Sequence, residues 1–271
     1  MSSMNVTKAI IPVAGWGARR LPITKAIEKC MLPIGNRPLV DYVVQDCLAA
    51  GVTELIFIVS EHSTQLEAYY RSNIHLNDYL KRNNKGDMLS LVAPVEARLH
   101  FVTQPSYGKY GTAVPVALAA DFIDEGESAV VLMGDDFIYN KDGSSEVARL
   151  IAATPEEQCS LLAAQVEPRD VSRYGVIASD AEGNYKKIVE KPQPDAAPSN
   201  LINISKYVLT KEVIDACQSV EASARGEYEL TDVINQHVER GAQVKVIPAM
   251  GQYLDGGSVE GWLHANNVVC G

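Results

Sequence analysis

The sequence predicts an α/β protein with a central, mostly parallel mixed sheet and helices on both of its faces. Short, continuously apolar runs alternate with amphipathic stretches along the first half of the 271-residue chain. A run without polar alternation is typical of a strand buried on both sides, and intervening helices are the crossovers that parallel strands require. The composition, 46% hydrophobic and 21% charged, is that of a globular protein able to bury a core without disulfides or a structural metal.

The first half supplies four expected strands and three expected helices. The strands are expected at residues 9–13, 55–59, 99–103 and 129–133, and the helices at 38–50, 60–70 and 111–122. Pro38 suits the first turn of the first helix and Gly51 can end it. Its apolar side chains share one face: Leu39, Val40, Val43, Val44, Cys47 and Leu48. Ser60 can cap the second helix, with Ser63 or Thr64 as alternative starts.

The second half is more mixed and shows no sharp domain boundary. Short β-like runs are expected at 161–166, 175–178, 186–189, 201–209 and 244–247, and helices at 229–241 and about 259–267. Polar breaks with proline fall between these runs, and no tandem repeat is visible. In the first half, the polar segment 83–88 is expected to be an inserted, exposed loop.

Charge and cysteine content narrow the class of protein. The net charge of −10 argues against general binding to nucleic acid or to an anionic membrane surface. Five widely spaced cysteines without a CxxC pair predict neither a disulfide framework nor a zinc site, and favour a reducing cytoplasm. The stretch from Met1 to Lys8 is polar rather than a signal peptide, and no apolar run is long enough to span a membrane.

A glycine-rich segment, VAGWGARRLP at residues 13–22, follows the first expected strand. Glycines there let backbone N–H groups approach a phosphate closely. The segment is neither a Walker A loop nor the dinucleotide fingerprint, because Arg20 stands at the third glycine's place. By itself the pattern is equally compatible with a plain structural turn. Trp16 and Trp262 are expected to be packing residues, with contact to a ligand as the alternative for Trp16.

Four cations, Arg19, Arg20, Lys25 and Lys29, lie within eleven residues of this otherwise acidic chain. The alternative is a solvated basic loop. A loop that directly follows the first strand, however, lies at the edge of the sheet where ligands bind. Arginine suits bidentate phosphate contacts and lysine neutralises charge, so we favour a polyphosphate site. Cys30 lies beside the cluster, whose charges lower a thiol pKa, but with no paired histidine nearby it is not expected to be catalytic.

Carboxylates follow two other expected strands. Asp135 and Asp136 come directly after residues 129–133, and Asp255 precedes two glycines near the C-terminus. Carboxylates that face phosphate-binding cations are typical ligands of Mg²⁺. Each aspartate alone could equally form an Asx turn or cap a helix. A metal held by both Asp135 and Asp255 is therefore the sharper hypothesis.

Val189-Glu190-Lys191-Pro192 ends a short strand with an acid, a base and a rigid break. A sugar phosphate needs a carboxylate for its hydroxyls and a cation for its phosphate. Neighbouring strand residues point to opposite faces, so Glu190 and Lys191 could serve together only if Pro192 twists the strand end. The alternative is an ordinary surface Glu–Lys pair.

Taken in chain order, these segments resemble the sugar nucleotidyltransferases, most of all the bacterial UTP–glucose-1-phosphate uridylyltransferases, also called UDP-glucose pyrophosphorylases. The matching stretches follow the family's order from Lys8 to Ser258. They are KAIIPVAGWGARRLPITKAIEKCMLP, RPLVDYVVQDCLAAGVTELIFI, QPSYGKYGTAVPVALA, LMGDD, RYGVI, IVEKP, KYVLT, GEYELTDVI and YLDGGS. Coincidence does not account for so many motifs in one order.

The resemblance implies a Rossmann-like nucleotidyltransferase fold forming a single domain over 1–271. Its nucleotide-binding half would be about 1–140 and its sugar-phosphate-binding half about 141–271. It also implies transfer of a nucleotidyl group from UTP to glucose 1-phosphate, giving UDP-glucose and pyrophosphate by Mg²⁺-assisted in-line attack on the α-phosphorus. The expected partners are a nucleoside triphosphate and a sugar 1-phosphate, and the family is commonly homo-oligomeric.

Residue roles follow from the same resemblance. The cations matching those that bind triphosphate or sugar phosphate are Arg19, Lys29 and Lys191. The residues matching nucleotide contacts are Ala14, Gly15, Gly17, Lys25, Gln104, Gly111 and Thr112, among which Lys25 favours the uridylyl over the thymidylyl branch. The sugar contacts would be Gly175, Glu190 and Ser205, and the magnesium ligands Asp135 and Asp255.

Four positions depart from the family pattern: Ala18 replaces Thr, Glu28 replaces Pro, Cys30 replaces Glu, and Ser205 replaces Gly. Ala18 removes a hydroxyl from the phosphate loop while Arg20 adds a charge, and Cys30 removes a carboxylate near the nucleotide. These departures leave open a thymidylyl or other nucleotidyltransferase acting on a different sugar 1-phosphate, or a non-catalytic regulator that binds a sugar nucleotide. A dinucleotide-dependent oxidoreductase is excluded by the missing third glycine.

Overall fold

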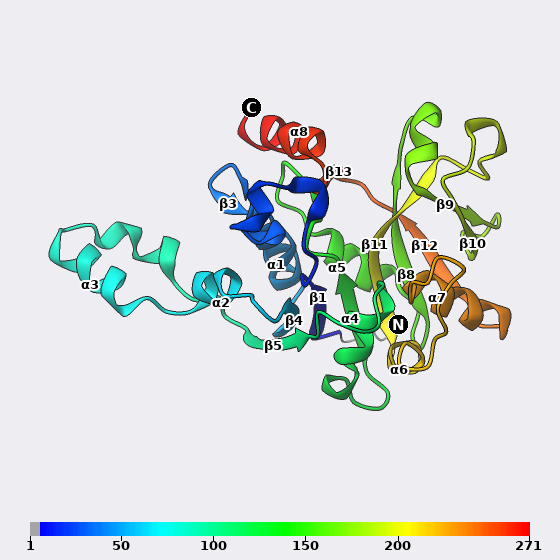
Figure 1. Ribbon diagram of the computed structural model, residues 1–271, viewed down its shortest axis with the longest axis horizontal. Helices are drawn as coiled ribbons and strands as arrows, with labels where there is room; N and C mark the ends of the chain where they lie inside the picture. The colour runs from blue at the N-terminus through cyan, green and yellow to red at the C-terminus, as the bar shows by residue number, and fades with distance from the viewer. Residues whose placement is uncertain (1–5) are drawn as a thin grey trace.

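A computed structural model describes residues 6–271, so the first five residues of the polar stretch Met1 to Lys8 lie outside it. Within that range nine strands form one mixed sheet in the order β10-β9-β11-β6-β1-β4-β5, with β8 and β12 extending from β11 (Figure 1). The nucleus is parallel, because β1 pairs in parallel with both β4 and β6, and β4 with β5. Strands of the second half join it antiparallel through β11 and β6.

The strands of the main sheet are β1 Lys8–Pro12, β4 Glu54–Ser60, β5 Arg98–Gln104, β6 Ser128–Leu132, β8 Cys159–Gln165, β9 Gly175–Ser179, β10 Tyr185–Glu190, β11 Leu201–Thr210 and β12 Val244–Pro248. Two small ribbons pair β2 Pro33–Ile34 with β3 Arg37–Pro38, and β7 Asp136–Tyr139 with β13 Gln252–Asp255. The helices are α1 Leu39–Ala49, α2 Gln65–Tyr70, α3 Ile74–Arg82, α4 Ala113–Leu118, α5 Glu146–Ala153, α6 Lys211–Ala216, α7 Leu230–Glu239 and α8 Val259–Cys270.

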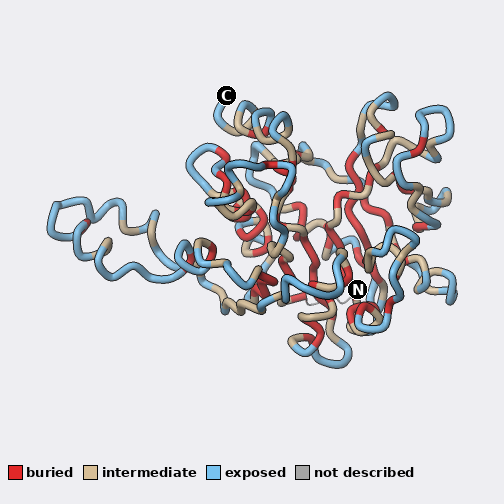
Figure 2. Tube along the Cα trace, in the orientation of Figure 1, coloured by how far each residue is buried: buried red, intermediate tan, exposed pale blue. Residues whose placement is uncertain are grey.

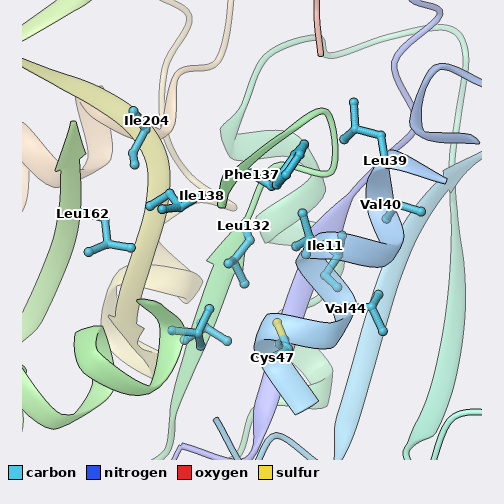
Figure 3. Packing of buried hydrophobic residues seen from close by; sticks show 14 of the residues in the cluster. Ile11, Leu39, Val40, Val44, Cys47, Leu132, Phe137, Ile138, Leu162 and Ile204 are labelled. Atoms are coloured by element: carbon cyan, nitrogen blue, oxygen red, sulfur yellow. The ribbon is translucent and has the colours of Figure 1, made fainter. Parts of the chain in front are cut away.

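The sheet is covered on both faces, as the apolar runs predicted. Side chains alternate across β1, so Ala9 and Ile11 enter one hydrophobic cluster and Ile10 enters the other. Helices α1, α5 and α8 contribute to the first cluster, and α4, α6 and α7 to the second. Figure 3 shows Ile11 and Leu132 of the sheet next to α1, whose Val44 and Cys47 belong to the same cluster. The predicted Rossmann-like fold with a mostly parallel central sheet is therefore confirmed.

Several predicted helices are shorter than the sequence pattern indicated. The helix expected at 60–70 begins only at Gln65, after Thr64, the latest of the three proposed starts. The one expected at 111–122 ends at Leu118 and continues as a separate 3-10 turn. Helices α5 and α6, with eight and six residues, were missed because a helix of two turns is too short to show a clear period.

The loop predicted at 83–88 is exposed, but it is only the tip of a longer insertion. Helix α3 precedes it, and a 3-10 segment, Gly86–Val92, begins within it. Figure 1 shows this arm projecting from the body, and Figure 2 shows that its surface is almost wholly exposed. The helical part was missed because α3 buries a single side chain, Leu80, and so has no continuous apolar face.

The β7–β13 ribbon crosses the carboxyl edge of the sheet and is anchored by one buried charge pair. Lys206 of β11, 2% exposed, donates through Nζ to the carboxylate of Asp136 and, at 3.2 Å, to its carbonyl oxygen. Tyr253 of β13 donates to the same carboxylate at 3.0 Å. Burial raises the pKa of Asp136 to about 6, so these donors are what keep the carboxylate charged at neutral pH. No helix between residues 6 and 271 is long and apolar enough to cross a membrane.

Replacing Lys206 with methionine should destabilise the protein by about 3–5 kcal/mol, because the Asp136 carboxylate would stay buried without its cation. Urea unfolding followed by circular dichroism measures the change. The matched control is Lys186→Met, which removes an exposed ion pair with Asp180 at 2.9 Å and should cost less than about 1 kcal/mol. Equal losses in the two variants would contradict this account of the buried pair.

Candidate active site

A cavity of about 670 Å³ lies beyond the carboxyl ends of β1, β4, β5 and β6. Parallel strands with helices on both faces place their ligands at this edge. The lining combines backbone of the glycine-rich segment with polar and charged side chains from the loops after each strand. Nine of the residues proposed from the sequence line it: Ala14, Gly15, Gly17, Arg19, Lys29, Gln104, Gly111, Thr112 and Asp135.

The glycine-rich segment turns sharply at Gly17, which has φ 64° and precedes the 3-10 turn Ala18–Arg20. A Cβ at Gly17 would lie 3.0 Å from Lys29 Cβ and from Thr24 Cγ2, so the position needs glycine for space as well as for its left-handed backbone. The Thr24 hydroxyl donates to the Gly17 carbonyl at 2.9 Å and fixes the turn. The turn therefore brings Lys29 against the loop that carries Arg19.

The two adjacent arginines go to different places. Arg19 is exposed and lines the cavity, whereas Arg20 is buried. Arg20 Nη1 donates to the carbonyl oxygens of Gly256 at 3.2 Å and Ser258 at 2.6 Å, and its guanidinium lies 5.2 Å from the Trp262 ring centroid. The expectation that Arg20 adds a charge to the phosphate loop is wrong, because its charge is directed into the backbone of the loop after β13.

Two carboxylates and two cations converge beside Gly257. A Cβ built on Gly257 would lie 2.8 Å from Asp255 Oδ1, 3.3 Å from Arg19 Nη2 and 3.4 Å from Lys29 Nζ. Lys29 forms an ion pair with Asp135. Although burial alone would raise the pKa of Asp135, the neighbouring cations, Lys29 first, hold it below its ordinary value. Asp135 is therefore an ionised acceptor facing a positively charged loop.

This convergence depends on the ribbon described above. The β7–β13 register opposes Asp255 to Asp136, and the Gly256 amide donates to the Asp135 carbonyl oxygen at 3.0 Å. Gly256 must be glycine, because a Cβ there would clash with Leu39 of α1. Asp255 is itself oriented by its own loop, since the Gly257 amide donates to Asp255 Oδ1 at 2.7 Å.

The residues present suit Mg²⁺. Asp135 and Asp255 offer hard carboxylate oxygens, and Gly257 adds no side chain of its own where Asp255 Oδ1 approaches the Arg19 and Lys29 cations. Within residues 6–271 no group of three or more His, Cys, Asp or Glu side chains is arranged to hold a metal. A pair of carboxylates, completed by phosphate and water oxygens, is the usual way in which proteins hold Mg²⁺ at a nucleotide.

Lys25 lies outside the main cavity. It is exposed and lines a smaller hollow of about 160 Å³, together with His62 and Gln65. This second hollow shares Gly15, Trp16 and Lys29 with the first. Lys25 is therefore separated from the Arg19 side of the loop and adjoins the Lys29 side.

Gly111 and Thr112 have structural roles in addition to the ligand contacts proposed for them. A Cβ on Gly111, whose φ is 137°, would clash with the backbone of Tyr228. The Thr112 hydroxyl donates to Glu229 at 3.2 Å and accepts from the Leu230 amide at 2.9 Å. Together they seat the start of α7 against the loop that follows β5.

The predicted sugar-binding residues lie outside the lining of the two cavities, in the second half of the chain. Gly175 and Glu190 are register partners in the β9–β10 pair, and a Cβ on Gly175 would lie 3.0 Å from Glu190 Oε1. The break predicted at Pro192 occurs one residue earlier: Lys191 has φ 46°, and its amide donates to the Tyr174 carbonyl at 3.0 Å. This turn ends the strict alternation of the strand.

Ser205 stands where the resembled family has glycine, and its φ of 52° accounts for that glycine. The residue interrupts the register of β11 between Asn203 and Tyr207. Its carbonyl oxygen accepts from the Met133 amide at 3.3 Å, so this irregular turn adjoins the strand end that carries Asp135.

Two other departures from the family pattern also receive a structural account. Glu28, in place of Pro, accepts hydrogen bonds from Ser63 Oγ at 2.7 Å and from the amides of Thr64 at 2.8 Å and Gln65 at 2.7 Å. It ties the basic loop to the start of α2. Cys30 is 2% exposed, and burial raises the pKa of its thiol, the opposite of the shift that a basic neighbourhood alone produces. Nothing in the structure explains Ala18 in place of Thr.

Trp16 was expected to pack, with contact to a ligand as the alternative. It is 64% exposed and lines the cavity, so the packing expectation is wrong. Other residues of the cavity were not identified from the sequence. Lys109, Tyr110 and Glu227 also line it. Glu227 is brought there only by the docking of the segment before α7, a contact across more than one hundred residues that leaves no local signal. Trp262, by contrast, packs as expected, with its indole donating to the Pro33 carbonyl at 2.7 Å.

Comparison with known proteins gives one consistent family. A family model described as nucleotidyl transferase matches residues 8–270. A UTP–glucose-1-phosphate uridylyltransferase of Pseudomonas aeruginosa is 31% identical, over 97% of this chain and 95% of that protein. A UDP-glucose pyrophosphorylase complexed with UDP-glucose superposes with a TM-score of 0.83 at 28% identity, over 98% of this chain and 99% of the other. A UTP-bound UGPase from Acinetobacter baumannii superposes with a TM-score of 0.87 at 28% identity, over 98% of this chain and 93% of the other.

Replacing Glu28 with alanine should destabilise the protein by about 2 kcal/mol, because two amides at the start of α2 and the Ser63 hydroxyl lose their acceptor. Thermal and urea unfolding measure the change. The control is Glu67→Ala, an exposed carboxylate on α2 itself, which should shift stability by less than about 0.5 kcal/mol. A Glu28→Ala variant as stable as the control would show that these hydrogen bonds contribute nothing net.

Proposed function

The chain belongs to the nucleotidyl transferase family, and we propose that it joins UTP to glucose 1-phosphate, forming UDP-glucose and releasing pyrophosphate. The observation that carries this is the convergence of Arg19, Lys29, Asp135 and Asp255 around one glycine at the carboxyl edge of the sheet. Two fixed cations with two carboxylates are what a triphosphate and its divalent metal require. The relatives that share nearly the whole length of the chain are named for this reaction or this sugar nucleotide.

The reaction is a displacement at phosphorus. An oxygen of the sugar 1-phosphate forms a bond to the α-phosphorus of UTP, the bond to the bridging oxygen of the β-phosphate breaks, and pyrophosphate leaves with that electron pair. Such a transfer needs positioning and charge neutralisation more than covalent help from the protein. Arg19 and Lys29, held against each other by the Gly17 turn, would bind the phosphate oxygens that gain charge as pyrophosphate departs.

A bound Mg²⁺ would neutralise triphosphate charge at Asp135 and Asp255. The chain's own contribution there is to bring the two carboxylates to the same turn and to hold Asp135 ionised. Asp135 is kept ionised by Lys29, and Asp255 is oriented by the Gly257 amide. Lys29 Nζ pairs with Asp135 and lies near the same glycine as Asp255 Oδ1, which supports the assignment of these two aspartates as the metal ligands.

The remaining roles are assigned by position. Gln104, Ala14 and Gly15 line the cavity and would contact the nucleobase. Glu190 and Lys191 would hold the sugar and its phosphate, since the turn at Lys191 lets neighbouring residues serve one ligand. Gly175, Ser205, Gly111, Thr112, Gly17 and Lys25 complete the proposed contacts.

Two further expectations from the sequence stay predictions. Four of the five cysteines are buried and all are free, which supports a reducing, cytoplasmic setting. The homo-oligomeric state expected from the resemblance is testable by light scattering, in which a mass near that of one 29.4 kDa chain would count against it.

Pyrophosphate release should be seen with UTP and glucose 1-phosphate in the presence of Mg²⁺. The same assay with dTTP, CTP, ATP and GTP, and with other sugar 1-phosphates, tests the alternatives that the departures leave open. We expect UTP and glucose 1-phosphate to give the highest kcat/KM. No turnover with UTP would exclude the proposal, and tight binding of UDP-glucose without turnover by any triphosphate would favour a regulator.

Asp135→Asn and Lys29→Ala should each lower kcat/KM by about a hundredfold or more, because each removes a fixed charge at the reacting phosphates. Asp142→Asn is the matched control, since that carboxylate lies on an exposed turn, where it accepts from Ser144. Its activity should stay within about twofold of the wild type. Full activity in both site variants would contradict the assigned roles.

A further inference from the structure

Arg20 is a buried cation that the proposed reaction does not use. Arg20 is 4% exposed, and of the two adjacent arginines only Arg19 lines the cavity. Burial lowers the pKa of Arg20, and the nearest opposing charges are those of Asp255 and Glu260. Its Nε is also buried and has no hydrogen-bond partner among the described residues. Burying a guanidinium with an unpaired nitrogen costs free energy. The hydrogen bonds that Arg20 does make must therefore have a structural role.

Those contacts are to one loop, the turn between β13 and α8. Arg20 Nη1 donates to the Gly256 carbonyl at 3.2 Å and to the Ser258 carbonyl at 2.6 Å, so one nitrogen ties both ends of the turn. The guanidinium also lies over the Trp262 ring, at 5.2 Å from its centroid. The ring is itself fixed, because its indole donates to the Pro33 carbonyl.

The Gly256 peptide unit connects this clamp to both acidic residues of the site. Its carbonyl accepts from Arg20, and its amide donates to the Asp135 carbonyl at 3.0 Å. Asp255 precedes it directly, and its Oδ1 accepts from the Gly257 amide at 2.7 Å. A shift of this turn would therefore move the Asp255 carboxylate relative to Asp135, although Arg20 touches neither side chain.

We propose that Arg20 is a positioning residue for the divalent metal: by clamping the 256–258 turn it sets the separation of the Asp255 and Asp135 carboxylates. This rests on the proposed function, because it concerns the metal site of the same reaction. The effect is indirect, because Arg20 acts through the backbone of the turn. The two adjacent arginines then have different roles: Arg19 binds phosphate and Arg20 positions the metal ligands. Residues that orient metal ligands in this way change metal affinity about 10–100-fold when they are replaced.

The test measures metal binding without turnover. Mn²⁺ affinity is determined from the free Mn²⁺ signal in electron paramagnetic resonance, with the protein saturated by UDP-glucose. We expect Arg20→Met to bind Mn²⁺ about tenfold or more weakly than the wild type. In the assay, the Mg²⁺ concentration for half-maximal rate should rise by a similar factor, while KM for UTP at saturating Mg²⁺ changes by less than about threefold.

Arg149→Met is the matched control, because Arg149 also donates to a backbone carbonyl, that of Pro248 at 2.7 Å, and its other hydrogen bonds go to Glu146 rather than to the 256–258 turn. It should lose stability but keep the Mn²⁺ affinity of the wild type. Arg20→Lys keeps the charge without the forked donors and should give an intermediate Mn²⁺ affinity. It also carries the test if Arg20→Met does not fold.

Wild-type Mn²⁺ affinity in a folded Arg20→Met variant, or in Arg20→Lys where the former does not fold, overturns the positioning role. So does an equal loss of affinity in Arg149→Met, because the effect would then be one of general stability. These outcomes are separate from a failure of the proposed function. That failure would appear as a wild-type protein that binds Mn²⁺ and UDP-glucose but does not consume UTP.

Discussion

The hydrogen bond from the Gly256 amide to the Asp135 carbonyl is the constraint on which the rest of the site depends. Asp135 and Asp255 are separated by more than one hundred residues along the chain. This bond closes the end of the β7–β13 ribbon where the two residues meet. Because Gly256 also packs against Leu39 of α1, the ribbon has a single position above the sheet. The two proposed metal ligands are therefore brought together by backbone geometry before any ligand is considered.

Charge is then distributed around that fixed point. An acidic chain gathers its cations in one loop after β1, but the structure divides them: Arg19 and Lys29 face Asp135 and Asp255, Arg20 turns into the backbone, and Lys25 lines a separate hollow. For the two arginines the division has a local cause, because the 3-10 turn Ala18–Arg20 directs successive side chains to different sides. UTP and glucose 1-phosphate are both anions, so such local concentration of cations is what an acidic enzyme needs to bind them.

Departures from the family pattern do not all weaken the site. Glu28 replaces a rigid proline with a carboxylate that caps α2, and Ser205 keeps the left-handed backbone that glycine would supply. Cys30 is a buried apolar contact. Each change is matched by packing or hydrogen bonding nearby, which favours a working enzyme over a regulator that has lost its catalytic parts. Only Ala18 has no counterpart in the structure.

Much of this was readable from the sequence, because it is encoded locally. Continuous apolar runs determined the strands of the parallel nucleus, and the motifs after them determined the family and the residues of the cleft. The tertiary structure alone decided which charges meet. Neither the burial of Arg20, the pairing of Asp136 with Lys206, nor the place of Glu227 and Trp16 at the cavity has a periodic or compositional signal. Each of these features depends on contacts between segments about seventy residues apart or more, or on the path of a single turn. Local periodicity in the sequence carries no information about such contacts.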